Sequence, residues 1–147
     1  MKKSRLSGKT TEKNLTKIIG KHVFGNLYDI DEKYLKDLQF LKTTMIEAAK
    51  IGNLHIIELM EKQFTAMNSP DIGGVSLIAL IEESHISLHT WPESKYATLD
   101  IYSCGEQSDP TLAFEYIVSV LKPKVYNVYN IDRSNVDDPV NKVVTNF

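Results

Sequence analysis

The sequence predicts an α+β fold, a two-layer sandwich in which one antiparallel sheet carries two helices on a single face. Two segments, 31–51 and 108–121, have apolar residues at the three- and four-residue spacing of a helix. Shorter runs bounded by glycine, proline and aspartate lie around them and are typical of strands. With 147 residues, of which 42% are hydrophobic, the chain is long enough to bury one core.

The first half of the chain should form a strand, a helix and a second strand. Residues 21–30 indicate the first strand, and Asp31 is a suitable N-cap for the helix after it. Gly52-Asn53 should end this helix. Its apolar stripe consists of Leu35, Leu38, Leu41, Met45 and Ala49. Residues 54–65 begin like a strand, but charged residues make their later half ambiguous.

The second half should add further strands and one helix. Residues 75–81 are almost wholly apolar, as expected for a central strand covered on both faces, and 96–103 indicate the next strand. Ser108-Asp109-Pro110 provides a cap and a first-turn proline for the second helix, which Pro123 should end. Residues 124–131 complete the sheet.

One domain, 19–133, is expected between a disordered N-terminal tail, 1–18, and a loose C-terminal tail, 134–147. The net charge of -2 gives no case for binding nucleic acid, which requires a basic surface. No apolar run approaches the roughly 18 residues of a membrane-spanning helix, and none is of signal-peptide type. Cys104 is the only cysteine, which excludes an intrachain disulfide and fits a reducing, cytoplasmic location.

The pair Glu83-Ser84, followed by His89 and Cys104, indicates a self-cleaving site that makes a pyruvoyl group. Decarboxylation of an amino acid needs an electrophilic group that accepts the electrons left by CO2, and side chains offer none. The chain has no glycine loop that would cradle pyridoxal phosphate. If the Ser84 hydroxyl attacked the Glu83 carbonyl, elimination and hydrolysis would cut the chain and leave a pyruvoyl group, which is such an acceptor.

From Gly20 to about Asp132 the chain resembles the prokaryotic S-adenosylmethionine decarboxylase proenzymes. The matching motifs stand in that family's order and spacing: Gly74-Val75-Ser76, Glu83-Ser84-His85, His89-Thr90-Trp91-Pro92-Glu93 and Asp100-Ile101-Tyr102-Ser103-Cys104-Gly105. The resemblance implies that Ser84 becomes a pyruvoyl group that forms a Schiff base with the substrate. It also implies that Ser76 and His89 assist self-cleavage and that Cys104 is the catalytic proton donor. The fold should be that of the family, with a β chain 1–83, an α chain 84–147 and dimers of αβ units.

The substrate expected from the resemblance is arginine. Members that use S-adenosylmethionine carry a phenylalanine about six residues before the serine that matches Ser76, where its ring stacks on adenine, whereas 68–72 contains none. Three segments are more similar to the archaeal branch that decarboxylates L-arginine to agmatine and CO2: 20–28, 73–80 and 131–134. S-adenosylmethionine is the alternative substrate, and either product would feed polyamine biosynthesis. Glu93 matches an acid that contacts ribose, and in an arginine enzyme it would hold the guanidinium.

Three other interpretations have to be weighed. Ser84, His89 and Asp100 supply the residue types of a hydrolase triad, but no Gly-x-Ser-x-Gly motif surrounds Ser84. A paralogue that stays uncut could serve as the partner of an active subunit, although every residue expected to act is present. The three histidines besides His89 lack the spacing of metal ligands, so no metal is expected.

Strand periodicity supplies a geometric test of the motif. Ser84 and His89 are five residues apart, so they would face opposite sides of an unbroken strand. If they act together, the chain must bend or bulge between them. A sheet with helices on only one face should also cover its other face, which predicts a symmetric homodimer or a higher oligomer.

Overall fold

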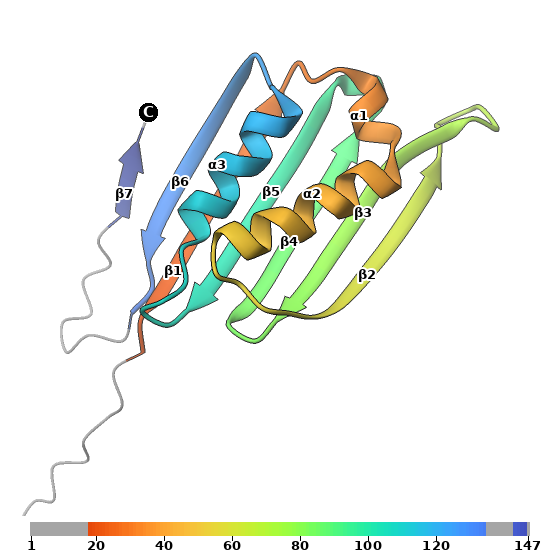
Figure 1. Cartoon of the computed structure of the whole chain (residues 1–147). Coiled ribbons are helices and arrows are strands. Elements are labelled where there is room, and N and C mark those ends of the chain that lie inside the picture. The colour runs from red at the N-terminus through yellow and green to blue at the C-terminus, as the bar shows by residue number, and fades with distance from the viewer. Residues whose placement is uncertain (1–17, 135–142, 147) are drawn as a thin grey trace, which may run out of the picture.

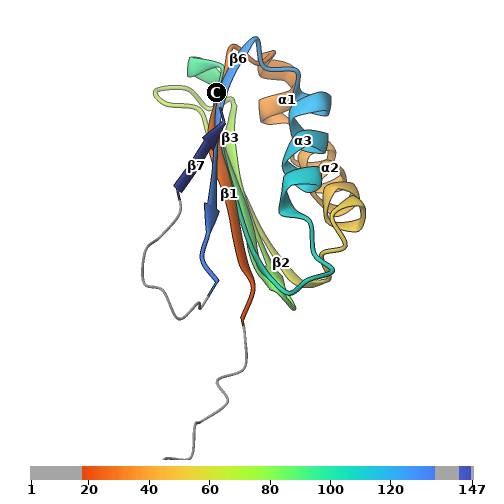
Figure 2. The ribbon, with the colours of Figure 1, turned by 90° about the vertical axis from the view of Figure 1, so that its left-hand side faces the viewer.

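The computed structural model describes residues 18–134 and 143–146, and it confirms the expected two-layer α+β architecture (Figure 1). In that part of the chain, seven strands form one antiparallel sheet in the order β2-β3-β4-β5-β1-β6-β7. Three α-helices lie against the same face of this sheet, as Figure 2 shows from the side. We call the other face, on which no helix of the described chain packs, the open face.

The element bounds follow the predicted order. The strands are β1 (Gly20–Tyr28), β2 (Ile56–Thr65), β3 (Ile72–Ile81), β4 (Ser84–Trp91), β5 (Tyr96–Cys104), β6 (Val125–Asp132) and β7 (Val143–Asn146). The helices are α1 (Glu32–Lys36), α2 (Leu38–Ile51), α3 (Pro110–Leu121) and the 3-10 turn η1 (Pro92–Ser94). The segment whose later half was ambiguous is therefore a strand along almost all of its length.

The helix predicted between Asp31 and Gly52 is two helices, which corrects the sequence interpretation. Asp31 caps α1 as expected, because its side chain accepts a hydrogen bond from Lys33 N. Asp37 then leaves the helical conformation, with φ -90° and ψ 93°, and its carboxylate accepts a 2.9 Å hydrogen bond from Phe40 N. An aspartate inside an apolar helical pattern can cap a new helix as well as continue the old one, and here it caps.

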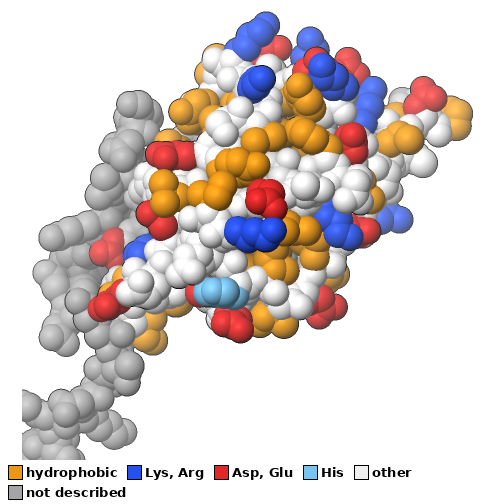
Figure 3. All heavy atoms as spheres, viewed as in Figure 1, with side chains coloured by type: hydrophobic (Ala, Val, Ile, Leu, Met, Phe, Trp, Pro, Cys, Tyr) orange, Lys and Arg blue, Asp and Glu red, His pale blue; other side chains and the backbone are white. Residues whose placement is uncertain are grey.

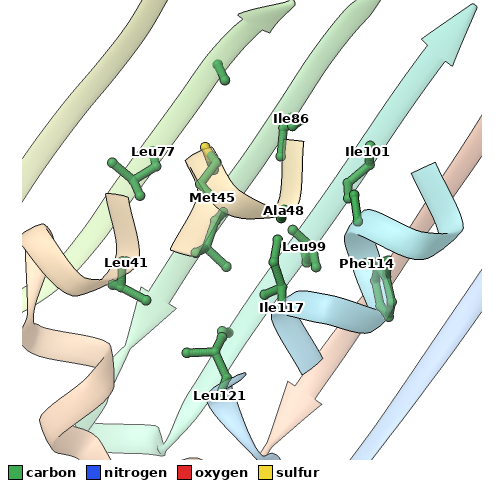
Figure 4. Close-up of a cluster of buried hydrophobic side chains, with 14 of the residues drawn as sticks. Leu41, Met45, Ala48, Leu77, Ile86, Leu99, Ile101, Phe114, Ile117 and Leu121 are labelled. Carbon is green, nitrogen blue, oxygen red and sulfur yellow. The ribbon is translucent and has the colours of Figure 1, made fainter. Parts of the chain in front are cut away.

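The core lies between the helices and one face of the sheet (Figure 4). Figure 4 shows side chains of α2 and α3 meeting those of β3, β4 and β5: Leu41, Met45, Ala48, Phe114, Ile117, Leu121, Leu77, Ile86, Leu99 and Ile101. Figure 3 shows the outer surface of the helices, where charged side chains of both signs are mixed with apolar ones. The helix layer thus covers the core and presents no patch of a single charge.

Strand β3 is covered on one face only, so its prediction as a strand buried on both faces is wrong for this chain. Val75, Leu77 and Ala79 are buried beneath the helices, whereas Ile78 and Leu80 are 41% and 51% exposed on the open face. The apolar run of β3 therefore reflects two different environments. The open face retains apolar side chains that no described part of the chain covers.

The two expected tails fall largely outside the described residues. Nothing is described for 1–17, 135–142 or 147, whereas residues 143–146, in the segment expected to be loose, form β7 and pair with β6. No helix in the described ranges is long and apolar enough to cross a membrane.

Candidate active site

Ser84 is the first residue of β4 and lies directly after the turn that follows β3. It pairs with Ile81 on one side and Ser103 on the other, and its Oγ lies 3.8 Å from Cys104 Sγ. Regular alternation would place Ser84 on the helix side with Ile86. Instead, its φ is 156°, a value that L-residues seldom adopt, and its side chain contacts Cys104 on the open face. Two residues that are twenty positions apart in sequence thus meet.

Glu83, which supplies the carbonyl next to Ser84, is held at both ends. Its carbonyl oxygen accepts a 2.9 Å hydrogen bond from Cys104 N, and its side chain accepts one of 3.0 Å from His55 N. The His55 ring adds a third contact, 2.5 Å from Nδ1 to Oε1. Partial burial opposes ionisation of Glu83, but the hydrogen bonds from the His55 backbone and ring outweigh it and lower the pKa of the carboxyl.

The thiol of Cys104 has one further partner. It donates a 3.5 Å hydrogen bond to Tyr102 Oη, and the guanidinium of Arg133 lies 4.0 Å above the Tyr102 ring. The neighbouring Cys104 and burial raise the pKa of the Tyr102 phenol, so it stays protonated at neutral pH. Gly105, with φ +106°, turns the chain immediately after this group. Tyr102 was missed in the sequence, although its two-residue spacing from Cys104 predicts the same strand face.

A second cluster occupies the opposite end of β4. Ser76 of β3 pairs with His89 of β4, and a 2.7 Å hydrogen bond joins Ser76 Oγ to His89 Nδ1. Both residues line a cavity of about 330 Å³. Glu93 in η1 lines it too, together with the rings of Phe64 and Trp91. The sequence placed Ser76, His89 and Glu93 in one site, and the fold does bring these three together.

The two clusters are far apart within one chain. Between Ser84 and His89, β4 pairs without interruption with both of its neighbours, so the bend or bulge that direct cooperation required is not there. Five strand residues at about 3.3 Å each separate the two by about 16 Å. Glu93 lies further still along the chain. A single copy of the described chain therefore does not join the His89 cluster to Ser84.

Asp100 lies in the middle of the open face, where its carboxylate contacts two histidines, neither of which is His89. Its carboxylate oxygens lie 2.9 Å from His22 Nε2 and 3.2 Å from His85 Nε2. The triad geometry that a hydrolase needs is thus missing among Ser84, His89 and Asp100.

One group in the described ranges brings three possible metal-ligand atoms within 4.8 Å of one another: His55, Glu82 and Glu83. Two of its members are already hydrogen-bonded to each other. The expectation that the protein uses no metal stays a prediction.

The antiparallel sheet, its single layer of helices and the Ser84–Cys104 contact fit the class expected from the sequence, a small α+β decarboxylase. The sequence model of the S-adenosylmethionine decarboxylase family matches residues 21–134, and the chain belongs to this family. The resemblance and the predicted decarboxylase class are thereby confirmed.

Individual relatives extend this result. The arginine decarboxylase proenzyme of Hyperthermus butylicus is 50% identical over 119 residues, which are 81% of each chain. That of Pyrobaculum arsenaticum is 52% identical over 119 residues, 81% of this chain and 87% of the relative. The crystal structure of the adenosylmethionine decarboxylase from Aquifex aeolicus superposes with a TM-score of 0.72 at 31% identity, covering 84% of this chain and 98% of that one.

Proposed function

We propose that this chain is a self-processing, pyruvoyl-dependent decarboxylase that converts L-arginine into agmatine and CO2 in the cytoplasm. The observation that carries the proposal is the geometry at Ser84. Its hydroxyl lies beside Cys104, and the Glu83 carbonyl that it would attack already accepts a hydrogen bond from Cys104 N. Two relatives that are about half identical over 119 aligned residues are named arginine decarboxylase proenzymes, which supports arginine as the substrate.

Self-cleavage begins when Ser84 Oγ attacks the Glu83 carbonyl carbon and the hydroxyl proton passes to a base. Negative charge then develops on the carbonyl oxygen that faces Cys104 N–H, which stabilises it. The C–N bond breaks, the nitrogen takes up a proton, and an ester remains. Loss of the Ser84 α-proton expels the Glu83 carboxylate and leaves dehydroalanine. Water then replaces the nitrogen, ammonia departs, and the new N-terminus is the pyruvoyl group.

The residues around Ser84 fit a pyruvoyl group at that position. The group would supply the carbonyl that accepts electrons as CO2 leaves. Cys104 Sγ, 3.8 Å from Ser84 Oγ, would deliver a proton to the α-carbon of the substrate. Tyr102 Oη accepts the hydrogen bond of the thiol and so orients it.

A homodimer would reconcile the two clusters. In a twofold dimer, each surface patch meets its own copy, so an axis near the middle of β4 would set the His89 end of one copy beside the Ser84 end of the other. Ser76 and His89 would then assist cleavage of the partner chain. Exposed apolar side chains on the open face support it as the interface: Met60, Ile78, Leu80 and Trp91.

S-adenosylmethionine remains the second candidate substrate, because one observation favours it. The sequence lacks a phenylalanine in 68–72, yet Phe64 of β2 lines the cavity that contains Glu93. In this pocket the aromatic ring could stack on adenine while the carboxylate binds ribose. Binding of the arginine guanidinium would need only the carboxylate of Glu93. The solved relative at 31% identity is an adenosylmethionine decarboxylase.

The test is to record the intact mass of purified protein and to measure CO2 release from each substrate with the same preparation. Two chains divided between Glu83 and Ser84, with turnover of arginine, are expected. Turnover of S-adenosylmethionine alone would assign the second function. A chain that stays uncut and inactive would contradict both and favour a role as partner of an active subunit.

A further inference from the structure

We infer that His55 is a positioning residue for self-cleavage, which holds Glu83 in the orientation that attack by Ser84 requires. The inference rests on the proposed self-processing and adds a residue outside every motif of the resemblance. His55 precedes β2, 28 positions before Glu83 in the chain, and only the pairing of β2 with β3 brings the two together.

Three hydrogen bonds join His55 to the turn that contains the scissile bond. Its backbone N–H and its ring Nδ1 contact the two different oxygens of the Glu83 carboxylate, at 3.0 and 2.5 Å. Its carbonyl oxygen accepts a 2.9 Å hydrogen bond from Glu82 N. His55 therefore fixes both the side chain of Glu83 and the backbone of the residue before it.

The other side of Glu83 is fixed by β5. Cys104 N–H binds the Glu83 carbonyl oxygen, so the acyl group is held between two elements from different parts of the chain. The Glu83 side chain is 15% exposed, whereas that of His55 is 57% exposed, so the ring covers the carboxylate from the solvent side. Attack within one dipeptide depends strongly on the angle between hydroxyl and carbonyl, and loss of either hold would let that angle vary.

Charge strengthens the His55–Glu83 contact. The hydrogen bond and the negative charge of Glu83 raise the pKa of His55, and Glu82 adds to this effect. Glu82 and Glu83 are the acidic groups that act on His55. A charge-assisted hydrogen bond is stronger than a neutral one, so the clamp is most effective while His55 is protonated and Glu83 is ionised.

The experiment compares the rates at which newly translated full-length chains cut themselves. His55→Ala should slow cleavage about tenfold, the factor that corresponds to about 1.4 kcal/mol in a barrier. His55→Asn places an amide N–H near the position of Nδ1 and should restore most of the rate. Glu47→Gln removes a charge from the exposed side of α2, away from the His55–Glu83 contact, and should cut at the wild-type rate. Once cut, every variant should decarboxylate with unchanged kcat/KM.

Folding is checked by the thermal midpoint of each variant combined with Ser84→Ala, which keeps all chains intact. If folded His55→Ala cuts as fast as wild type, or if His55→Asn is as slow as His55→Ala, the positioning role is wrong while self-processing stands. If the wild-type chain itself never cuts, the proposed function fails first. Slow His55→Ala with rescue by His55→Asn would establish the role.

Discussion

At the scale of single residues, the backbone N–H and the thiol of Cys104 make different contacts. Its backbone N–H binds the Glu83 carbonyl, and its thiol faces Ser84 and Tyr102. The first contact concerns the self-cleavage proposed above, and the second concerns turnover of the substrate. Because a substitution changes the side chain and leaves the N–H in place, the two stages should be separable at this one position.

Cys104→Ser should cut itself at close to the wild-type rate and then decarboxylate at least about 100-fold more slowly, the usual contribution of a positioned general acid. The measurements are the fraction of cut chain on a denaturing gel and CO2 release per cut chain. Near-normal turnover by the cut variant would remove Cys104 from the proton-donor role. Ser119→Ala, a change on the exposed side of α3, is the control for handling of the protein.

Glu93→Gln should raise KM for arginine about tenfold or more, because a charged pair with the guanidinium becomes a neutral contact worth about 1.4 kcal/mol less. Steady-state kinetics on cut protein supply the measurement, and kcat should change much less than KM. Glu115→Gln, the same exchange at an exposed site on α3, should leave both constants unchanged. An unchanged KM in Glu93→Gln would assign guanidinium binding to another group.

The sequence could name the pair Ser84 and Cys104, because both lie in motifs with fixed spacing. It could not reveal His55 or the backbone bond to Glu83. Those contacts depend on the register of β2 against β3 and of β4 against β5, and register is a property of the folded sheet. Tyr102 lay within a quoted motif, but its role emerges only from the thiol beside it.

At the scale of elements, β4 and the helix pair α1 and α2 show how local signals compete. β4 stays regular between its two functional ends, so the length of strand between Ser84 and His89 keeps them apart, although the unusual φ of Ser84 brings it to Cys104 on the open face. The helical periodicity of 31–51 was read correctly, but Asp37 interrupts it. Periodicity locates the buried stripe and cannot decide whether one aspartate caps a helix or continues it.

Asp37→Ala should lower the free energy of unfolding by about 1 kcal/mol, the usual cost of an N-cap that loses its side-chain acceptor. Urea unfolding followed by circular dichroism measures it, with Ser84→Ala present in both proteins so that neither is cut. Asp37→Asn keeps an acceptor at the cap and should lose far less. Equal losses for the two variants would show that charge, and not the hydrogen bond to Phe40 N, stabilises the start of α2.

At the scale of the whole molecule, the open face sets the main question. It carries the two clusters at opposite ends of β4 and has exposed apolar residues on β3 between them, Ile78 and Leu80. The sequence pattern predicted that one face of the sheet would have no helices. Because nearly every residue of β3 is apolar, the pattern did not predict which of its side chains lie on that face. A second copy of the chain is the occupant that we propose, because it would complete both sites at once.

Mixed dimers test this directly. Ser84→Ala and His89→Ala chains, each with a different tag, should each stay largely uncut when alone. When they are co-expressed, the His89→Ala chain should be cut, because its own Ser84 meets an intact His89 from its partner. The double variant Ser84→Ala/His89→Ala in place of the Ser84→Ala chain is the control and should give no rescue. Absence of cutting in purified mixed dimers would place the assisting histidine in the same chain as its serine.

The strand order has a consequence for what becomes of the two fragments. A cut before Ser84 would assign β1, β2 and β3 to one fragment and β4, β5, β6 and β7 to the other. In the sheet, however, β1 lies between β5 and β6, so the fragments interleave rather than abut. The two fragments can separate only if the backbone hydrogen bonds of β1 to both β5 and β6 are broken. Cleavage therefore changes the covalent connectivity of the molecule but not the pairing of its strands. The two fragments should co-migrate until the sheet is unfolded.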